Sequence, residues 1–506
     1  MNPRSRSTRP AAAILLAAAL VSTPWPSEAQ LIPLRTVPVA SGDQFRLLPS
    51  HTMGMGGVRY AVDDSLADPW GNPATGFRAT TAFIGSPTFY GISEGRGAGR
   101  SFPVAGVFAG QEWFGGVSVA LQQVENTNGD EIFFFGAPTL DLCCAGCCGQ
   151  PRTLSETFGR NLYSMGYVGR RIGSGPWTVG VGISAASLDA MDGVDLLYAG
   201  ADRIEQSGSI TDVRAGILRD LDGERISFVL AHNRVSMEHD VTFTDWRWDD
   251  TLQVPVVERR LEANEDKTRT WAAQVGWNRD LAADGWRVGI SGTVNRKSHP
   301  KIPNYTIQNI PRDPGETWAY ELGLGFAVTQ EASTFALDVA LQPIWSNTWQ
   351  EADTADVTAS GGRLEVGDRS IENDFFFTNV VMRSGLSHRV DRLTFQAGVE
   401  VRSYDYQLDQ VNRVEQTARD QDESWIEWSP TFGALVALDA LDIRYGLRVT
   451  TGTGRPGTAG DIFLAAAPGD QLLGSGADFI LAPDGPLTLQ DARVVTHQLS
   501  VTLPVR

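Results

Sequence analysis

The chain has 506 residues, of which 42% are hydrophobic, and this content is too low for a bundle of membrane helices. Its net charge of −18 excludes the broad basic surface that binding to nucleic acid requires. We attribute the acidity to solvated loops, with the bridging of divalent cations as the alternative.

Residues 1–29 are predicted to form a secretory signal peptide. Arg4, Arg6 and Arg9 provide its positive start, and the apolar run 11–21 is too short to cross a bilayer as a helix. The small residues before Gln30 fit a cleavage site. No later stretch reaches the roughly 20 consecutive apolar residues of a membrane helix. The protein is therefore expected to be exported, and any insertion into a membrane must use strands.

The segment 30–77 shows no alternation of apolar and polar residues. Gly56 and Gly57 permit close backbone contact, and Asn72-Pro73 marks a turn before the first predicted strand. If the following strands close into a barrel, this segment is expected to fold back into it as a hatch or plug. An extension that caps the barrel from the periplasm is the alternative.

The remainder, 78–506, contains short segments in which apolar and polar residues alternate, as they do in half-exposed strands. For example, Trp318, Tyr320, Leu322, Leu324 and Phe326 form one apolar row. Sixteen such segments are predicted: 78–90, 101–109, 112–124, 157–170, 177–188, 208–219, 225–244, 268–279, 286–296, 317–328, 334–349, 373–388, 393–406, 424–438, 441–451 and 491–505.

The connections between these segments alternate in length. Tight connections such as 220–224 and 389–392 are separated by long polar ones: 125–156, 189–207, 245–268, 297–316, 350–372, 407–423 and 452–490. Outer-membrane barrels have short periplasmic turns and longer external loops. The pattern predicts an all-β fold, an antiparallel transmembrane β-barrel of about 14–16 strands, with both termini in the periplasm.

In a membrane barrel the apolar rows face lipid, so the polar rows line the lumen. The charged residues on these inward rows have mixed signs, which indicates a wet lumen with paired charges, mostly structural: Arg287, Glu321, Asp338, Glu400, Arg402, Glu427, Arg444 and Arg448. Tryptophans near the segment ends favour a membrane barrel over a soluble one.

All four cysteines lie in the predicted external loop 125–156. In an exported protein, disulfides are expected among Cys143, Cys144, Cys147 and Cys148. Sequence cannot choose among the three possible pairings. A zinc site is the alternative, but the crowded spacing and an oxidising compartment disfavour it.

No catalytic motif is evident. The six histidines are scattered and none shows the HExxH spacing of a zinc peptidase. No phosphate-binding glycine loop is present. We therefore expect neither an enzyme nor a cofactor.

A family resemblance is carried by the segment before the first strand, which contains Gly56-Gly57, Ala61, Asp63-Asp64, Ala67 and Asn72-Pro73-Ala74. In order and spacing it resembles the FadL-type family of outer-membrane hydrocarbon transporters and the PorV-like proteins related to it. The resemblance implies a hatch inside a barrel that moves hydrophobic molecules, with Gly56, Gly57, Asp63, Asp64, Asn72, Pro73 and Ala74 as hatch and gating residues. The family barrel has fourteen strands, whereas sixteen are predicted here, and the chain ends in Arg506 rather than in an aromatic residue.

The resemblance also implies sideways exit of the substrate through an interruption of a strand. Proline removes a ladder donor and glycine weakens a strand, so candidate positions are Pro87, Pro103, Gly115 and Gly116. Glycine kinks and bulges that only curve the barrel are the alternative.

We therefore predict an outer-membrane channel for passive uptake of hydrophobic or amphipathic small molecules such as long-chain fatty acids. Its expected partners are outer-membrane lipid and the transported molecules. Two alternatives are a PorV-like membrane platform for secreted protein partners and a general diffusion porin.

Overall fold

The structure is a computed structural model, and it describes residues 31–32, 43–93, 97–125, 158–191, 203–249, 254–281, 285–299, 302–304, 310–312, 314–352, 355–453 and 491–505. The signal peptide and the four cysteines lie outside these residues. Within them, no helix is long and apolar enough to cross a membrane.

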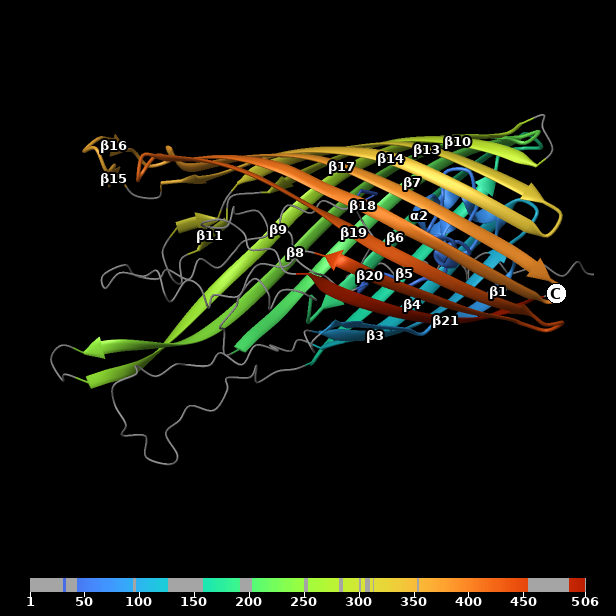
Figure 1. Ribbon diagram of the computed structural model, residues 1–506, viewed down its shortest axis with the longest axis horizontal. Helices are drawn as coiled ribbons and strands as arrows, with labels where there is room; N and C mark the ends of the chain where they lie inside the picture. The colour runs from blue at the N-terminus through green and yellow to red at the C-terminus, as the bar shows by residue number, and fades with distance from the viewer. Residues whose placement is uncertain are drawn as a thin grey trace, which may run out of the picture.

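One antiparallel sheet closes on itself into a barrel (Figure 1). Closure occurs where the last strand pairs with the two halves of the first, so that Phe83 lies opposite Leu503 and Phe89 lies opposite His497. The barrel has sixteen strands, as predicted. In chain order they are β1 (Ala82–Gly85) continued by β2 (Thr88–Ile92), β3 (Ala98–Ala109), β4 (Trp113–Glu125), β5 (Phe158–Arg171), β6 (Trp177–Leu188), β7 (Arg203–Leu221), β8 (Glu224–Asp249), β9 (Val254–Asp280), β10 (Trp286–His299), β13 (Gly315–Gln330), β14 (Ser333–Glu351), β17 (Arg369–Val390), β18 (Leu393–Asn412), β19 (Thr417–Ala437), β20 (Asp442–Thr453) and β21 (Ala492–Pro504).

Short turns join the strands at the end of the barrel where the described chain finishes (Figure 1). Asp222 and Gly223 both have positive φ, as a tight hairpin turn between strands of right-handed twist requires. We call this the turn end and the opposite end the loop end. Two small hairpins, β11 (Ile302–Asn304) with β12 (Ile310–Arg312) and β15 (Asp356–Val357) with β16 (Arg363–Leu364), lie at the loop end (Figure 1).

Several strands extend much further at the loop end than the alternation indicated. The connections predicted at 245–268 and 407–423 are largely strand, because β8 and β9 stay paired to Asp249 and Val254, and β18 and β19 stay paired to Asn412 and Thr417. Charged and amide residues are frequent in the extensions, for example at 258–267 and 417–423, and they interrupt the apolar period of two. The prediction of long loops there was wrong for that reason.

The first strand begins later than predicted, because the 3-10 helix η3 (Pro73–Arg78) precedes it. Two other short helices, η2 (Met53–Met55) and α2 (Asp68–Gly71), belong to the same N-terminal segment. This segment lies inside the barrel near the turn end (Figure 1). We call residues 43–78 the hatch.

The outer face of the barrel is apolar. On β13 the residues from Trp318 to Phe326 alternate between exposed and buried, and Leu322 is 63% exposed. The opposite face of the same strand carries Ala319, Glu321 and Gly325, which point into the barrel. An outward apolar row with polar and small residues inside is the arrangement of a barrel surrounded by lipid.

Candidate functional site

A belt of glycines on the inner wall receives the hatch. Its members form cross-strand pairs near the turn end: Gly180 with Gly216, Gly289 with Gly325, Gly385 with Gly398, and Gly433 with Gly446. A Cβ atom added to any of them would lie within 3.1 Å of a hatch atom. At Gly289 it would lie 1.8 Å from the carbonyl oxygen of Tyr60, and at Gly398 it would lie 2.3 Å from the nitrogen of Gly56. The belt therefore lets the hatch backbone lie directly against the wall.

Gly56 of the hatch makes one of these close approaches, whereas a Cβ on Gly57 would meet nothing within 4 Å. Both have positive φ, close to 72°, which favours glycine strongly. A Cβ on Gly56 would lie 2.6 Å from the carbonyl oxygen of Val399. The Gly56 N–H donates to Thr431 Oγ1 at 2.8 Å. Gly56 is thus a docking point of the hatch on the wall, and Gly57 contributes its positive φ to the turn.

The next residues of the hatch are held by two buried carboxylates of the wall. Arg59 Nη2 donates to Glu321 at 2.7 Å, and the hydroxyl of Tyr60 donates to the same carboxylate at 2.8 Å. The backbone N–H groups of Arg59 and Tyr60 donate to Asp338 Oδ2 at 2.6 and 3.3 Å. We call Arg59, Tyr60, Glu321 and Asp338 the latch.

Asp63 and Asp64 have different roles. Asp63 accepts from three arginines, with distances of 2.8 Å to Arg78, 2.5 Å to Arg225 and 3.0 Å to Arg287. It therefore joins the hatch to two wall strands. Asp64 instead organises the hatch itself, since its carboxylate accepts from backbone N–H groups of His51, Leu66 and Ala67.

Asn72, Pro73 and Ala74 form the last contact of the hatch with the wall. The Asn72 side chain accepts from the Ala74 N–H at 3.1 Å and so caps η3. It faces Gly216, while Pro73 lies over Gly180. Ala74 is fully buried. These three residues therefore sit where the hatch chain enters the wall.

Most of the charges predicted to line the lumen contact the hatch or one another. Arg287 binds Asp63, Arg444 donates to the Ser50 carbonyl at 3.3 Å, and Arg448 lies 4.0 Å from Asp43. Glu400 is central to a buried wall cluster, with its carboxylate 2.6 Å from Arg383, 2.9 Å from Arg448 and 3.7 Å from Arg402. Glu427 accepts from the Tyr404 hydroxyl at 3.2 Å.

The candidates for a lateral opening lie in a closed part of the wall. The first strand is interrupted at Ser86 and Pro87, yet β21 pairs in the same register on both sides of the interruption. The Ser86 N–H donates to the Pro103 carbonyl at 3.1 Å, and the Leu499 N–H donates to the Pro87 carbonyl at 3.0 Å. Gly115 and Gly116 pair regularly with β5. A lateral opening at these four positions stays a prediction.

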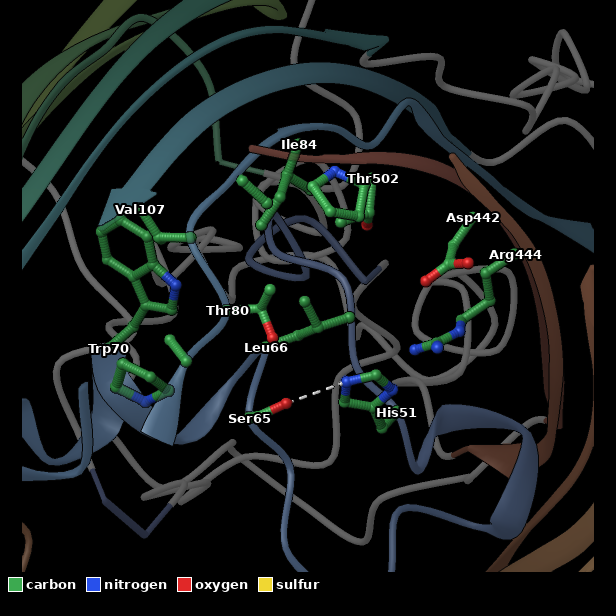
Figure 2. Close-up of a pocket in the computed structure, with 14 residues that line it drawn as sticks. His51, Ser65, Leu66, Trp70, Thr80, Ile84, Val107, Asp442, Arg444 and Thr502 are labelled. Carbon is green, nitrogen blue, oxygen red and sulfur yellow. Dashed lines mark hydrogen bonds between the residues drawn. The ribbon is translucent and has the colours of Figure 1, made fainter. Parts of the chain in front are cut away.

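A cavity of about 90 Å³ remains between the hatch and the wall formed by β1, β3, β20 and β21. His51, Ser65 and Trp70 line it from the hatch, while Ile84 and Arg444 line it from the wall (Figure 2). His51 Nε2 and Ser65 Oγ are 3.1 Å apart. This is a side of the hatch where the packing against the wall is incomplete.

Acidification should weaken hatch docking through His51. Burial, and then the charge of Arg444, lower the pKa of His51 from 6.5 to about 4, although Asp64 opposes the shift. As the pH falls from 6.5 towards 4, His51 becomes protonated when the hatch is undocked but stays neutral when the hatch is docked. Docking should therefore lose up to about 3 kcal/mol over this window.

The measurement is amide hydrogen exchange of the hatch in the wild type and in His51→Gln at several pH values. Burial beside Asp64 raises the pKa of Asp68, which gives an opposite pH dependence in both proteins, so their difference isolates His51. That difference should grow as the pH falls below 6.5. Parallel curves for the two proteins would contradict the assignment.

An apolar cluster lines the lumen on the loop side of the hatch. Phe375 and Phe377 of β17 lie beside Tyr406 and Leu408 of β18, and Ala319 and Ile344 complete the wall of the cluster. The Phe377 and Tyr406 ring centroids are 5.3 Å apart. We call these six residues the lumen cluster. Its position is unusual because inward faces of a membrane barrel are otherwise polar.

Ile32, which precedes the hatch in the chain, covers the lumen cluster. Its side chain is fully buried there, and its carbonyl accepts from Asn295 Nδ2 at 3.1 Å. An aliphatic side chain from the N-terminal segment thus fills an apolar site on the inner wall.

Sequence reasoning missed the glycine belt, the lumen cluster and several partners of the hatch. Arg225 and Arg383 are inward charges whose strand periodicity could have identified them. The belt glycines also lie on inward positions, but only the contact with the hatch reveals why they are glycines. For the lumen cluster, the run 375–377 of three phenylalanines hides the alternation, because Phe376 faces outward and the other two face inward.

The fold and the surface define the class of the protein: a transmembrane β-barrel of the outer-membrane type, filled near its turn end by an N-terminal hatch. No protein-family model and no curated protein matches the sequence.

Several solved structures are similar to this chain. The toluene transporter TbuX of Ralstonia pickettii shares 12% identity at a TM-score of 0.38, covering 90% of this chain and 97% of that one. The toluene transporter TodX of Pseudomonas putida shares 11% sequence identity at a TM-score of 0.37, and the match covers 94% of this chain and 100% of TodX. A FadL homologue of Pseudomonas aeruginosa shares 9% sequence identity at a TM-score of 0.44, and the match covers 92% of this chain and 100% of the homologue.

Proposed function

We propose that this protein is an outer-membrane channel for the passive uptake of hydrophobic or amphipathic small molecules, with long-chain fatty acids as candidate substrates. The observation that carries the proposal is the lumen cluster, an aromatic and aliphatic surface inside an otherwise polar barrel. Such a surface would be unfavourable facing water and gains free energy when an apolar group covers it, at about 25 cal/mol per Å². Ile32 shows the kind of group that fits it.

In this proposal the loop end faces the outside, and both termini lie in the periplasm. An apolar molecule enters from the loop end, displaces Ile32 and occupies the lumen cluster. Movement beyond that point requires the hatch to shift, because the hatch lies between the cluster and the turn end. Asp63, the latch and the glycine contacts of Gly56 are the interactions that must loosen. The molecule then has two possible exit routes: past the hatch at the turn end, or sideways through the wall near Pro87.

Replacement of Phe377 by Ser should reduce uptake of a radiolabelled C18 fatty acid by about tenfold, because it removes much of the apolar area that the chain contacts. The control is Phe376→Ser, the neighbouring residue of β17, which faces outward and is not part of the cluster. It should leave uptake close to the wild-type rate. The assay compares cells that produce each variant at equal surface levels with cells that lack the protein.

Equal uptake by cells with and without the protein, across several apolar probes, would overturn the proposal. Uptake of small hydrophilic solutes by the wild type, without discrimination, would favour a diffusion porin instead. Stoichiometric co-purification of secreted proteins, without bound lipid, would favour the platform function.

A further inference from the structure

Two arginines face each other on the outside of the barrel. Arg234 of β8 and Arg269 of β9 are register partners, and both side chains are exposed on the outer face. Residues directly opposite on one face of an antiparallel pair have Cβ atoms about 4.5–5.5 Å apart, and like charges there are destabilising. The pair therefore costs free energy in the isolated protein.

No protein group in the described part of the chain compensates these two charges with an ion pair or side-chain hydrogen bond. The flanking residues in the same cross-strand row are Thr211 on β7 and Ser298 on β10, which are neutral hydroxyls. The nearest acid along the row is Glu316, and it is already bound by Arg296 at 2.8 Å. Lys267, at the next outward position beyond Arg269, pairs with Glu265.

The height of the pair on the barrel points to what could lie between the guanidinium groups. Outward tryptophans mark both edges of the apolar band: Trp286 at the turn end, and Trp271 and Trp318 beside Arg296 towards the loop end. The distance from Trp286 to Arg296 along β10, at about 3.3 Å per residue and a tilt of about 40°, corresponds to roughly 25 Å, the height of an apolar band. Arg269 is the next outward residue beyond Trp271, which places it at headgroup level.

We propose that Arg234 and Arg269 together bind the phosphate of an anionic lipid in the outer leaflet, a phosphorylated glycolipid such as lipid A. Two planar guanidinium groups on one face can each donate two hydrogen bonds to a phosphate. Thr211 adds a hydroxyl at one side, while the Ser298 hydroxyl at the other side donates to the Arg269 carbonyl at 3.5 Å. The phosphate turns a repulsive pair into a favourable bridge. The site is separate from the lumen and needs no assumption about the transported molecule, although it takes the loop end as external, as proposed above.

The test measures binding of bisphosphorylated lipid A and of its dephosphorylated form to the purified full-length protein by native mass spectrometry. The wild type should prefer the phosphorylated lipid, and Arg234→Gln/Arg269→Gln should bind it about tenfold more weakly. Arg279→Gln/Arg392→Gln removes the same number of charges near the turn end, where Arg279 ends the outer face of β9, and should bind like the wild type. Equal binding by both double variants would overturn the proposal, as would equal binding of the two lipids by the wild type.

The variant Arg269→Glu distinguishes a specific loss of lipid binding from a loss caused by misfolding. It places opposite charges across the strands, so the barrel should be at least as stable in detergent as the wild type while lipid binding is lost. Retention of wild-type binding by this variant would contradict the site. Inorganic phosphate at equal concentration should not compete, because the proposed ligand is anchored in the membrane; full competition would show a free-anion site and overturn the assignment to lipid.

Discussion

Gly289→Val should open the barrel. The new Cβ would lie 1.8 Å from the Tyr60 carbonyl oxygen, so either the wall or the hatch must move. The wall at Gly289 is hydrogen-bonded to strands on both sides, opposite Asn278 and Gly325, whereas the hatch has no sheet to hold it. We therefore expect the hatch to leave the wall, because overpacking at this contact destabilises the docked position. The conductance of the reconstituted protein should then rise about tenfold or more.

Gly292→Val is the matched control, because it lies on the same strand and a Cβ there meets nothing within 4 Å. It should conduct like the wild type. Planar-bilayer recordings give the conductance, and sensitivity of cells to a large hydrophilic antibiotic gives an independent measure of opening. Wild-type conductance in Gly289→Val, with unchanged hydrogen exchange around Tyr60, would show that the glycine belt does not hold the hatch.

Arg59→Met should release the latch. The Glu321 carboxylate is fully buried, and without Arg59 its hydrogen-bond partners are the neutral Tyr60 and Gln342, while the charge of Arg383 acts on it only from beyond ion-pair distance. A buried charge that loses its partner costs about 3 kcal/mol or more. Exchange of the hatch amides around Arg59 should become about a hundredfold faster, since every 1.4 kcal/mol is a factor of ten.

The double variant Arg59→Met/Glu321→Gln provides the critical comparison. It removes the stranded charge, so its hatch should exchange more slowly than that of Arg59→Met alone. Arg296→Met is the control for loss of an arginine, because the Arg296–Glu316 pair is exposed on the outer face. Exposed pairs contribute less than about 1 kcal/mol, and hatch exchange should not change. A double variant no better than the single one would mean that Arg59 holds the hatch by packing rather than by charge.

Much of the barrel was predictable because its signals are local. An outward row such as that of β13 depends only on residues spaced by two, and lipid imposes the same requirement on every strand. Tight turns such as Asp222-Gly223 are equally local. The strand count and the antiparallel order followed from these features. The extensions of β8 and β9 could not be predicted in this way, because a strand that projects beyond the membrane faces water and needs no apolar row.

The hatch residues were predictable only in part. The motif around Gly56-Gly57 and Asn72-Pro73-Ala74 indicated a segment with an unusual backbone conformation, but it did not indicate which wall residues this segment contacts. The partners come from elsewhere in the chain: Asp338 for the Arg59 backbone, Gly180 for Pro73 and Thr431 for Gly56. No spacing rule connects residues so distant.

The sequence by itself determined that the chain crosses a membrane with strands, which residues of those strands face lipid, and at which end the tight turns lie. These properties depend on each strand's own alternation against a uniform apolar solvent. Only the tertiary structure decided how the hatch docks, why the belt glycines carry no side chain, which charges neutralise one another, and that two arginines face each other outside. Those properties depend on the register between strands and on contacts across the lumen, which arise once the barrel has closed.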